Sequence, residues 1–144
     1  MLFATKSLSY SRIFEGENDM KKNIFVNLSN HPSQRWCQEQ KEAVDKIVPD
    51  AQIMDYPFPS VDSSLNEAQI LKLADQLADE IVVLEPSAVM CQGEFGLTFA
   101  LVSILKKNGI KVVYSCSERK TTEHQTERGT EKISTFMFVK FREY

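Results

Sequence analysis

The 144-residue sequence lacks the features that identify several large classes of protein. Its three cysteines are far apart and odd in number, and none has the C-x-x-C spacing of a metal or redox site, which indicates a reduced compartment. Charged residues interrupt every apolar run well before the ~18 residues of a membrane span. The net charge of −3 provides no general attraction to duplex nucleic acid or to membrane surfaces. We therefore expect a cytoplasmic protein that has neither a membrane nor duplex nucleic acid as its partner.

Sequence signatures of cofactor and catalytic sites are missing too. The chain contains neither a G-x-G-x-x-G dinucleotide motif nor a G-x-x-x-x-G-K-S/T phosphate loop, and it has no G-x-S-x-G serine elbow. The two histidines, His31 and His124, are far apart, and no H-E-x-x-H or cysteine cluster occurs. The sequence therefore predicts no metal and no bound cofactor, so a local cluster of side chains would have to hold any anionic ligand.

The length fits one domain with a substantial core. Residues 1–19 contain aromatic and serine residues but neither the apolar segment nor the cleavage pattern of a signal peptide. Met20 resembles a natural start, because a predicted strand follows it directly. We expect residues 1–19 to be a peripheral, dispensable extension and residues 20–144 to form the domain.

Short apolar runs alternate with helical patterns through most of the chain. The predicted strands are residues 23–29, 51–55, a run that follows Pro86 and ends at Gln92, and 111–117. The predicted helices begin at Pro32, at a Ser64–Glu67 capping box and at Phe95, and the last one ends with a left-handed cap at Asn108-Gly109. The second helix has a predicted buried stripe of Leu71, Ala74, Leu77, Ala78 and Ile81. The third helix is apolar nearly all round, which predicts burial on two sides.

The C-terminal part has a different pattern. Residues 118–131 are wholly polar and are predicted to form an exposed loop, and residues 134–141 are predicted to form an aromatic-rich last strand. Helical crossovers make the first four strands parallel, and the direct connection makes the last strand an antiparallel neighbour. The predicted fold is a three-layer Rossmann-like α/β sandwich, with four mostly parallel strands plus an antiparallel C-terminal strand.

Polar residues follow three of the predicted strands. They are Ser29, Asn30 and His31 after the first strand, Gln92, Gly93 and Glu94 after the third, and Ser117, Glu118, Arg119 and Lys120 after the fourth. Parallel α/β sheets bind ligands at the carboxyl ends of such strands, so we expect these groups to converge on one rim. Their hydroxyls, amides, carboxylates and cations suit a ligand that carries phosphates, such as a nucleotide.

Each of these roles has a structural alternative. Gly93 permits a tight turn and close ligand approach, while Glu94 is either a reactive carboxylate or only a complement to the helix dipole. His31 has a pKa range that suits acid–base chemistry, or it is a packed or solvated residue beside Pro32. Arg119 with Lys120 could clamp a phosphate, or Arg119 could form a surface ion pair with Glu118.

Several stretches carry a resemblance to a known family. They are residues 27–33 (NLSNHPS) with Trp36, 56–59 (YPFP), 93–95 (GEF), 97–102 (LTFALV), 117–119 (SER) and 141–144 (FREY). Through them, residues 23–144 resemble a family of small single-domain CRISPR-associated proteins. Members of that family have His and Met where Met90 and Gln92 stand here. This family is similar in fold to CARF sensors and ring nucleases, so the resemblance implies a homodimer that binds a nucleotide or cyclic oligoadenylate.

A second resemblance is local. The order Gly-Glu-Phe-Gly-Leu-Thr-Phe-Ala at residues 93–100 is similar to the strand–Glu–helix corner of nucleoside deoxyribosyltransferase-like enzymes, in which a Glu attacks a sugar carbon. This resemblance implies a catalytic role for Glu94.

Three functional hypotheses follow from these observations. The first is a CRISPR-associated accessory protein for antiviral defence that binds a cyclic or linear oligonucleotide signal. A metal-independent ring nuclease would use His31 as general base and Arg119 or Lys120 to stabilise charge. The second is a nucleoside or nucleotide deoxyribosyltransferase-like enzyme with Glu94 as nucleophile. The third is a non-catalytic protein-interaction module, and the aromatic last strand favours a dimer.

Overall fold

The computed structural model describes residues 23–144 of the chain. The predictions for residues 1–19 and Met20 therefore lie outside the described residues. The strands and helices, in chain order, are β1 (Ile24–Ser29), α1 (Gln38–Ile47), β2 (Gln52–Pro57), α2 (Glu67–Val83), β3 (Ala88–Cys91), α3 (Phe95–Lys107), β4 (Lys111–Thr126) and β5 (Gly129–Glu143). Among the described helices, none is long and apolar enough to cross a membrane.

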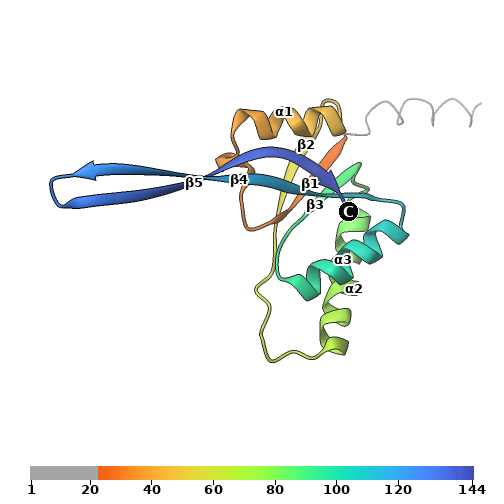
Figure 1. The fold of residues 1–144 in the computed structure, drawn as a ribbon. Coiled ribbons are helices and arrows are strands. Elements are labelled where there is room, and N and C mark those ends of the chain that lie inside the picture. Colours follow the sequence, from red (N-terminus) through yellow and green to blue (C-terminus); the bar gives the residue numbers. More distant parts are fainter. Residues whose placement is uncertain (1–22) are drawn as a thin grey trace, which may run out of the picture.

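The strands form one sheet in the order β2-β1-β3-β4-β5 (Figure 1). β2, β1, β3 and β4 are parallel, and β5 pairs antiparallel with β4. The fold is thus a mixed α/β fold compatible with the Rossmann-like type. This confirms the predicted strand directions, including the antiparallel last strand.

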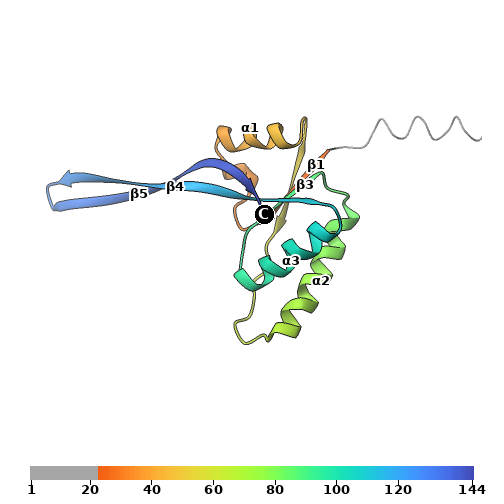
Figure 2. The ribbon, with the colours of Figure 1, turned by 45° about the vertical axis from the view of Figure 1, so that its right-hand side comes forward.

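Alternate residues of β1 contribute to two different hydrophobic clusters. Phe25 packs with Trp36 and Val44, which lie on or before α1, whereas Val26 packs in the cluster that contains Leu101 of α3. Figure 2 shows α1 on one side of the sheet and α2 and α3 together on the other. Because strand side chains alternate between faces and both faces of β1 are covered, Phe25 on one face and Val26 and Leu28 on the other are all buried.

Three predictions about the helices are wrong in detail. The cap of α2 is Asn66, whose side chain accepts from the Gln69 N–H at 3.0 Å, while Ser64 bonds to Asp62 instead. Leu71 is 55% exposed and so does not belong to the buried stripe of α2, although Ala74, Leu77, Ala78 and Ile81 are buried as predicted. The first helix begins at Gln38, after a short 3₁₀ turn over Ser33–Arg35.

The bounds of α3 and its glycine cap are confirmed, with Gly109 at a φ of 75°. The predicted burial of α3 on two sides is confirmed, because α3 packs both against the sheet and against α2, but its outer face is exposed. Phe95 is 92% exposed and Phe99 is 77% exposed. Leu97, Leu101 and Leu105 provide the buried face.

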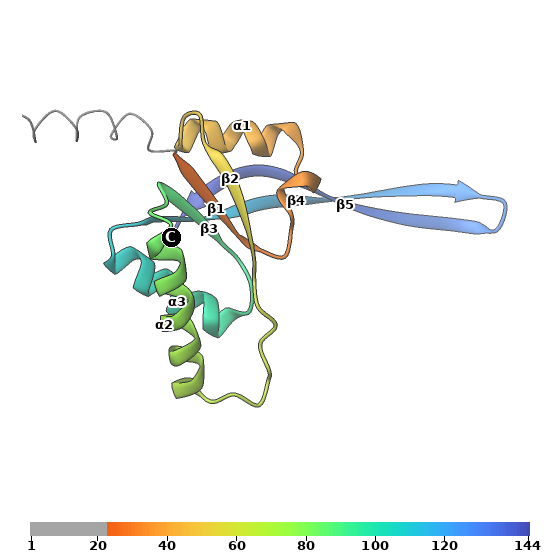
Figure 3. The ribbon, with the colours of Figure 1, turned by 180° about the vertical axis from the view of Figure 1, so that it is seen from behind.

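The predicted loop over residues 118–131 is also wrong. β4 continues to Thr126, a two-residue turn follows, and β5 begins at Gly129, whose positive φ of 132° suits glycine. We call residues 117–138 the arm; it begins at a bulge where Cys116 opposes Lys140 but Ser117 opposes Phe138, which leaves Val139 as the extra residue. Figures 1 and 3 show the arm projecting far beyond the rest of the protein.

Candidate functional site

β1, β3 and β4 are neighbouring strands, as predicted, and the carboxyl ends of β1 and β3 lie side by side. Leu28 pairs with Cys91, and the Gln92 N–H donates to the Leu28 carbonyl at 3.1 Å, so Ser29 and Gln92 are close neighbours. The side chain of Gln92 nevertheless already has hydrogen-bond partners within the protein. Its Oε1 accepts from the backbone N–H of Ser115 at 3.0 Å and from the Ser115 hydroxyl at 2.8 Å. Gln92 therefore fastens β3 to β4.

A buried hydrogen-bond network holds the loop after β1. The Ser29 hydroxyl donates to Asn27 Oδ1 at 2.6 Å, and Asn27 Nδ2 donates at 2.8 Å both to Asp55 Oδ1 and to the His31 carbonyl. Trp36 Nε1 donates to the same carbonyl at 3.1 Å. Ser29 is thus structural, and the network uses the backbone of His31 rather than its imidazole.

Asn30 and His31 are both exposed at this rim. Sequence reasoning missed Asn27 and Asp55, which are paired in register between β1 and β2. The available signal was a polar residue, Asn27, inside an apolar strand. A buried amide needs a hydrogen-bond partner, and the end of a neighbouring strand is a natural place for one.

Glu94 is the N-cap of α3. Its carboxylate accepts from the Leu97 N–H at 2.8 Å and from the Gly96 N–H at 3.1 Å, and these bonds lower its pKa, with Leu97 contributing more. The first N–H groups of α3, which would otherwise be free to face an anion, therefore already bind a carboxylate. This geometry favours the structural alternative for Glu94.

Gly93 is explained by packing. A Cβ built at this position would lie 2.3 Å from a ring carbon of Phe58, which is only 4% exposed. The Phe58 ring takes the space beside the backbone in which we expected a ligand. Any side chain at residue 93 would displace that ring.

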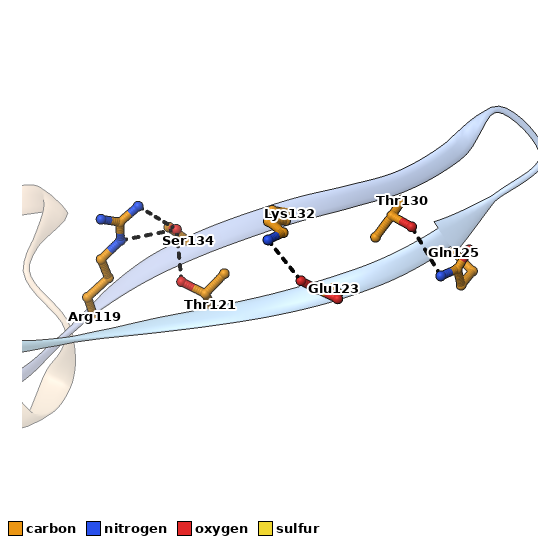
Figure 4. Close-up of polar contacts among 7 residues, drawn as sticks. All are labelled: Arg119, Thr121, Glu123, Gln125, Thr130, Lys132 and Ser134. Carbon is orange, nitrogen blue, oxygen red and sulfur yellow. Dashed lines mark hydrogen bonds and ion pairs between the residues drawn. The ribbon is translucent and has the colours of Figure 1, made fainter.

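The remaining predicted site residues lie on β4 at or beyond the bulge. Ser117, Glu118, Arg119 and Lys120 are exposed and belong to the arm. Arg119 donates to the Ser134 hydroxyl through Nε at 3.2 Å and Nη2 at 3.1 Å (Figure 4). Arg119 lies four residues beyond Ser115, the partner of Gln92, which is roughly 13 Å along a strand. The expected strand end at Ser117 does not exist.

The structure has a groove that the sequence did not predict. A cavity of about 370 Å³ lies between α1 and β5, and we call it the α1–β5 groove. Its lining residues are Glu39, Glu42, Ala43, Lys46 and Ile47 on α1 and Phe138, Val139, Lys140 and Phe141 on β5. The ring centroids of Phe138 and Phe141 are 5.0 Å apart, so aromatic packing continues from the core to the root of the arm.

Cys91, at the end of β3, is a buried residue as predicted. Burial raises the pKa of its thiol to about 12. The Tyr144 hydroxyl donates to the Cys91 carbonyl at 2.7 Å, and burial raises the pKa of Tyr144 to about 12. Neither group has the lowered pKa of a nucleophile. Within residues 23–144, no cluster of three or more His, Cys, Asp or Glu side chains is arranged to hold a metal ion.

The comparisons with known proteins identify the family of the chain. No curated protein matches the sequence. A family model described as "Uncharacterized protein MJ1673 family" matches residues 23–142, a range that includes every helix of the described residues, the complete arm and all but the last residue of β5. The chain therefore belongs to the MJ1673 family.

Proposed function

We propose that the protein is a non-catalytic interaction module that binds another protein through its arm. The arm is the observation that carries this proposal. Every residue of the arm is exposed except Phe138, which is half-buried. A two-stranded ribbon by itself is marginally stable in water, so contact with a partner would stabilise this one.

The arm carries more apolar surface than a solvated ribbon needs. Phe136 is 71% exposed, Ile133 49% and Met137 46%. The register places Phe136 opposite Arg119 on one face, while Ile133 opposes Thr122 and Met137 opposes Glu118 on the other. Exposed aromatic and methionine side chains are enriched in protein interfaces.

The charges of the arm favour a protein rather than a nucleic acid as its binding partner. The arm contains four acidic residues (Glu118, Glu123, Glu127 and Glu131) and four basic ones (Arg119, Lys120, Arg128 and Lys132). Nucleic-acid binding needs an excess of basic residues on one face. A balanced set of charges instead suits a protein surface of mixed charge.

The two catalytic hypotheses gain less support from the geometry. To act as a glycosyl nucleophile, the Glu94 carboxylate would first have to break its hydrogen bonds with the backbone N–H groups of Gly96 and Leu97. A ring nuclease needs a cation beside His31, whereas Arg119 binds Ser134 on the arm. Catalysis requires reacting groups to be held together, and these groups have other partners.

Nucleotide binding is the second candidate, because the strand order favours it. In a sheet ordered 2-1-3-4-5, ligands bind between β1 and β3, where exposed Asn30 and His31 lie next to the β3 end. On this proposal the chain is a three-layer Rossmann-like, CRISPR-associated cytoplasmic dimer that binds a nucleotide or cyclic oligoadenylate. Thermal shift tests it, since a ligand at 100 times its Kd stabilises by about 2.7 kcal/mol.

A photo-crosslinking amino acid at position 136 tests the leading proposal in cells. The matched control has the same amino acid at Val83, an 80% exposed apolar residue of α2. We expect a discrete protein adduct from position 136 and none from position 83. Equal labelling from both positions, or an adduct with nucleic acid, would contradict the proposal.

A further inference from the structure

We propose that the partner of the arm is a second copy of this chain, with two arms antiparallel about a two-fold axis and each tip in the α1–β5 groove of the other copy. This inference rests on the proposed function, because it names the protein that the arm binds. It explains two features together, the unpaired arm and the groove at its root.

The position of the groove fits this symmetry. β5 residues 138–141 line the groove, and the arm begins at the same place. The β4 side of the arm runs from Ser117 to Thr126, roughly 30 Å at the rise of a strand. A two-fold axis through the middle of the arm brings each tip to the root of the other arm. One self-complementary interface therefore uses both features in both copies.

The tip and the groove each carry charges of both signs, so that opposite charges can be paired between them. The groove carries Glu39 and Glu42 with Lys46 and Lys140. The tip carries Arg128 in the turn between β4 and β5, with Glu127 beside it. Cross-strand contacts already link other polar residues of the arm, including an ion pair of 3.1 Å between Glu123 and Lys132 (Figure 4). We therefore assign Arg128 to the acidic residues of the partner groove.

The contact area requires the groove as well as the arm. One face of the arm, about 30 Å long and two strand spacings wide, supplies roughly 300 Å². A stable complex buries ~800 Å² per partner, so arm-to-arm contact alone is insufficient. Each dimer contains two contacts between a tip and a groove, and these contacts would have to supply the remaining area. Of the exposed apolar residues, Phe136 would lie in this contact, because it shares a face of β5 with Phe138, which lines the groove, whereas Ile133 and Met137 lie on the opposite face.

Sedimentation of the full-length protein tests the inference. We expect a particle of twice 16.5 kDa, and we expect Phe136→Asp to raise its dissociation constant at least tenfold, as loss of an aromatic side chain buried in an interface does. The matched control, Val83→Asp, should leave the dimer intact. Circular dichroism must show both variants folded, and Phe136→Ala provides a milder substitution if Phe136→Asp unfolds. A dimer unaffected by either Phe136 variant would overturn the inference.

A charge exchange tests the groove separately. Glu42→Arg and Arg128→Glu should each weaken the dimer several-fold, and the double variant should recover most of the loss. Absence of recovery would overturn the assignment of the tip to the groove. A monomeric wild-type protein would overturn the whole inference. If the photo-crosslinker at position 136 then captured a different protein, the proposed function would stand. If it captured no protein at all, both the proposed function and this inference would be overturned.

Discussion

β3 and the arm use the same backbone geometry in opposite environments. All four residues of β3 are buried, because β3 pairs with β1 on one side and β4 on the other and packs into a cluster of side chains on each face. The arm has β pairing of equal regularity, but only its own two strands. Tertiary packing therefore determines β3, whereas cross-strand pairs alone determine the arm.

The polar contacts of the arm show how such pairing works without a core. Thr121 and Ser134, Glu123 and Lys132, and Gln125 and Thr130 meet directly across the two strands (Figure 4). Each such pair contributes only about 0.2–1 kcal/mol. A substitution should therefore have a large effect in β3 and a small one in the arm.

Val89→Asp should have the largest effect on stability. Val89 is 0% exposed, so an unpaired carboxylate there costs several kcal/mol. The matched change in the arm, Ile133→Asp, places the same charge at a residue that is 49% exposed. We expect Val89→Asp to abolish soluble folded protein and Ile133→Asp to preserve it, as measured by yield and urea unfolding. Equal yields would show that β3 is not the centre of the core.

Gly93→Ala should have the next largest effect. Its Cβ would meet the Phe58 ring at 2.3 Å, and overpacking of this kind costs about 1–3 kcal/mol. Gly96→Ala is the control, because its Cβ meets only the Glu94 carboxylate at an ordinary 3.5 Å, inside a helix that alanine favours. Urea unfolding should show a loss for Gly93→Ala and a small gain for Gly96→Ala. A gain for both would mean that the Phe58 ring moves freely.

Glu94→Gln should weaken the cap of α3 in a pH-dependent way. Hydrogen bonds from Leu97 and Gly96 lower the folded pKa of Glu94 below its ordinary 4.5. Its contribution is therefore complete above the unfolded pKa and is lost as pH falls through the folded pKa. Melting temperatures should differ between wild type and Glu94→Gln at pH 7 and converge at acid pH. Glu127→Gln, in the turn of the arm, is the control and should follow wild type throughout.

The sequence predicted the packed region well because burial imposes a period on it. The bounds of α3, the position of β3 and the neighbouring ends of β1 and β3 are as predicted. The sequence did not predict that β4 and β5 extend into residues 118–131, because a ribbon without a buried face needs no alternation of apolar and polar residues. Its signal was the pairing of Glu123 with Lys132, which becomes visible only once the two strands are aligned.

The candidate site was predicted only in outline. The crossover rules place Ser29 beside Gln92, but they do not indicate that Asp55 binds Asn27 or that Phe58 packs against Gly93. Those contacts depend on the register of β1 against β2 and on the path after Pro57. Arg119 was assigned to the rim because the predicted fourth strand ended at Ser117, and the extension of β4 moved it onto the arm.

The smallest expected effect tests the arm itself. The side chains of Glu123 and Lys132 are 58% and 69% exposed, and solvent screens a pair of this kind. In a monomeric variant such as Phe136→Asp, a double-mutant cycle with Glu123→Ala and Lys132→Ala should give a coupling below about 0.5 kcal/mol, which decreases further in high salt. If the arm frays before the core unfolds, global unfolding should report a coupling free energy near zero. Amide exchange of the arm residues should still detect the coupling. A coupling of several kcal/mol would mean that the pair is shielded from solvent, as it would be if a second copy of the chain covered the arm.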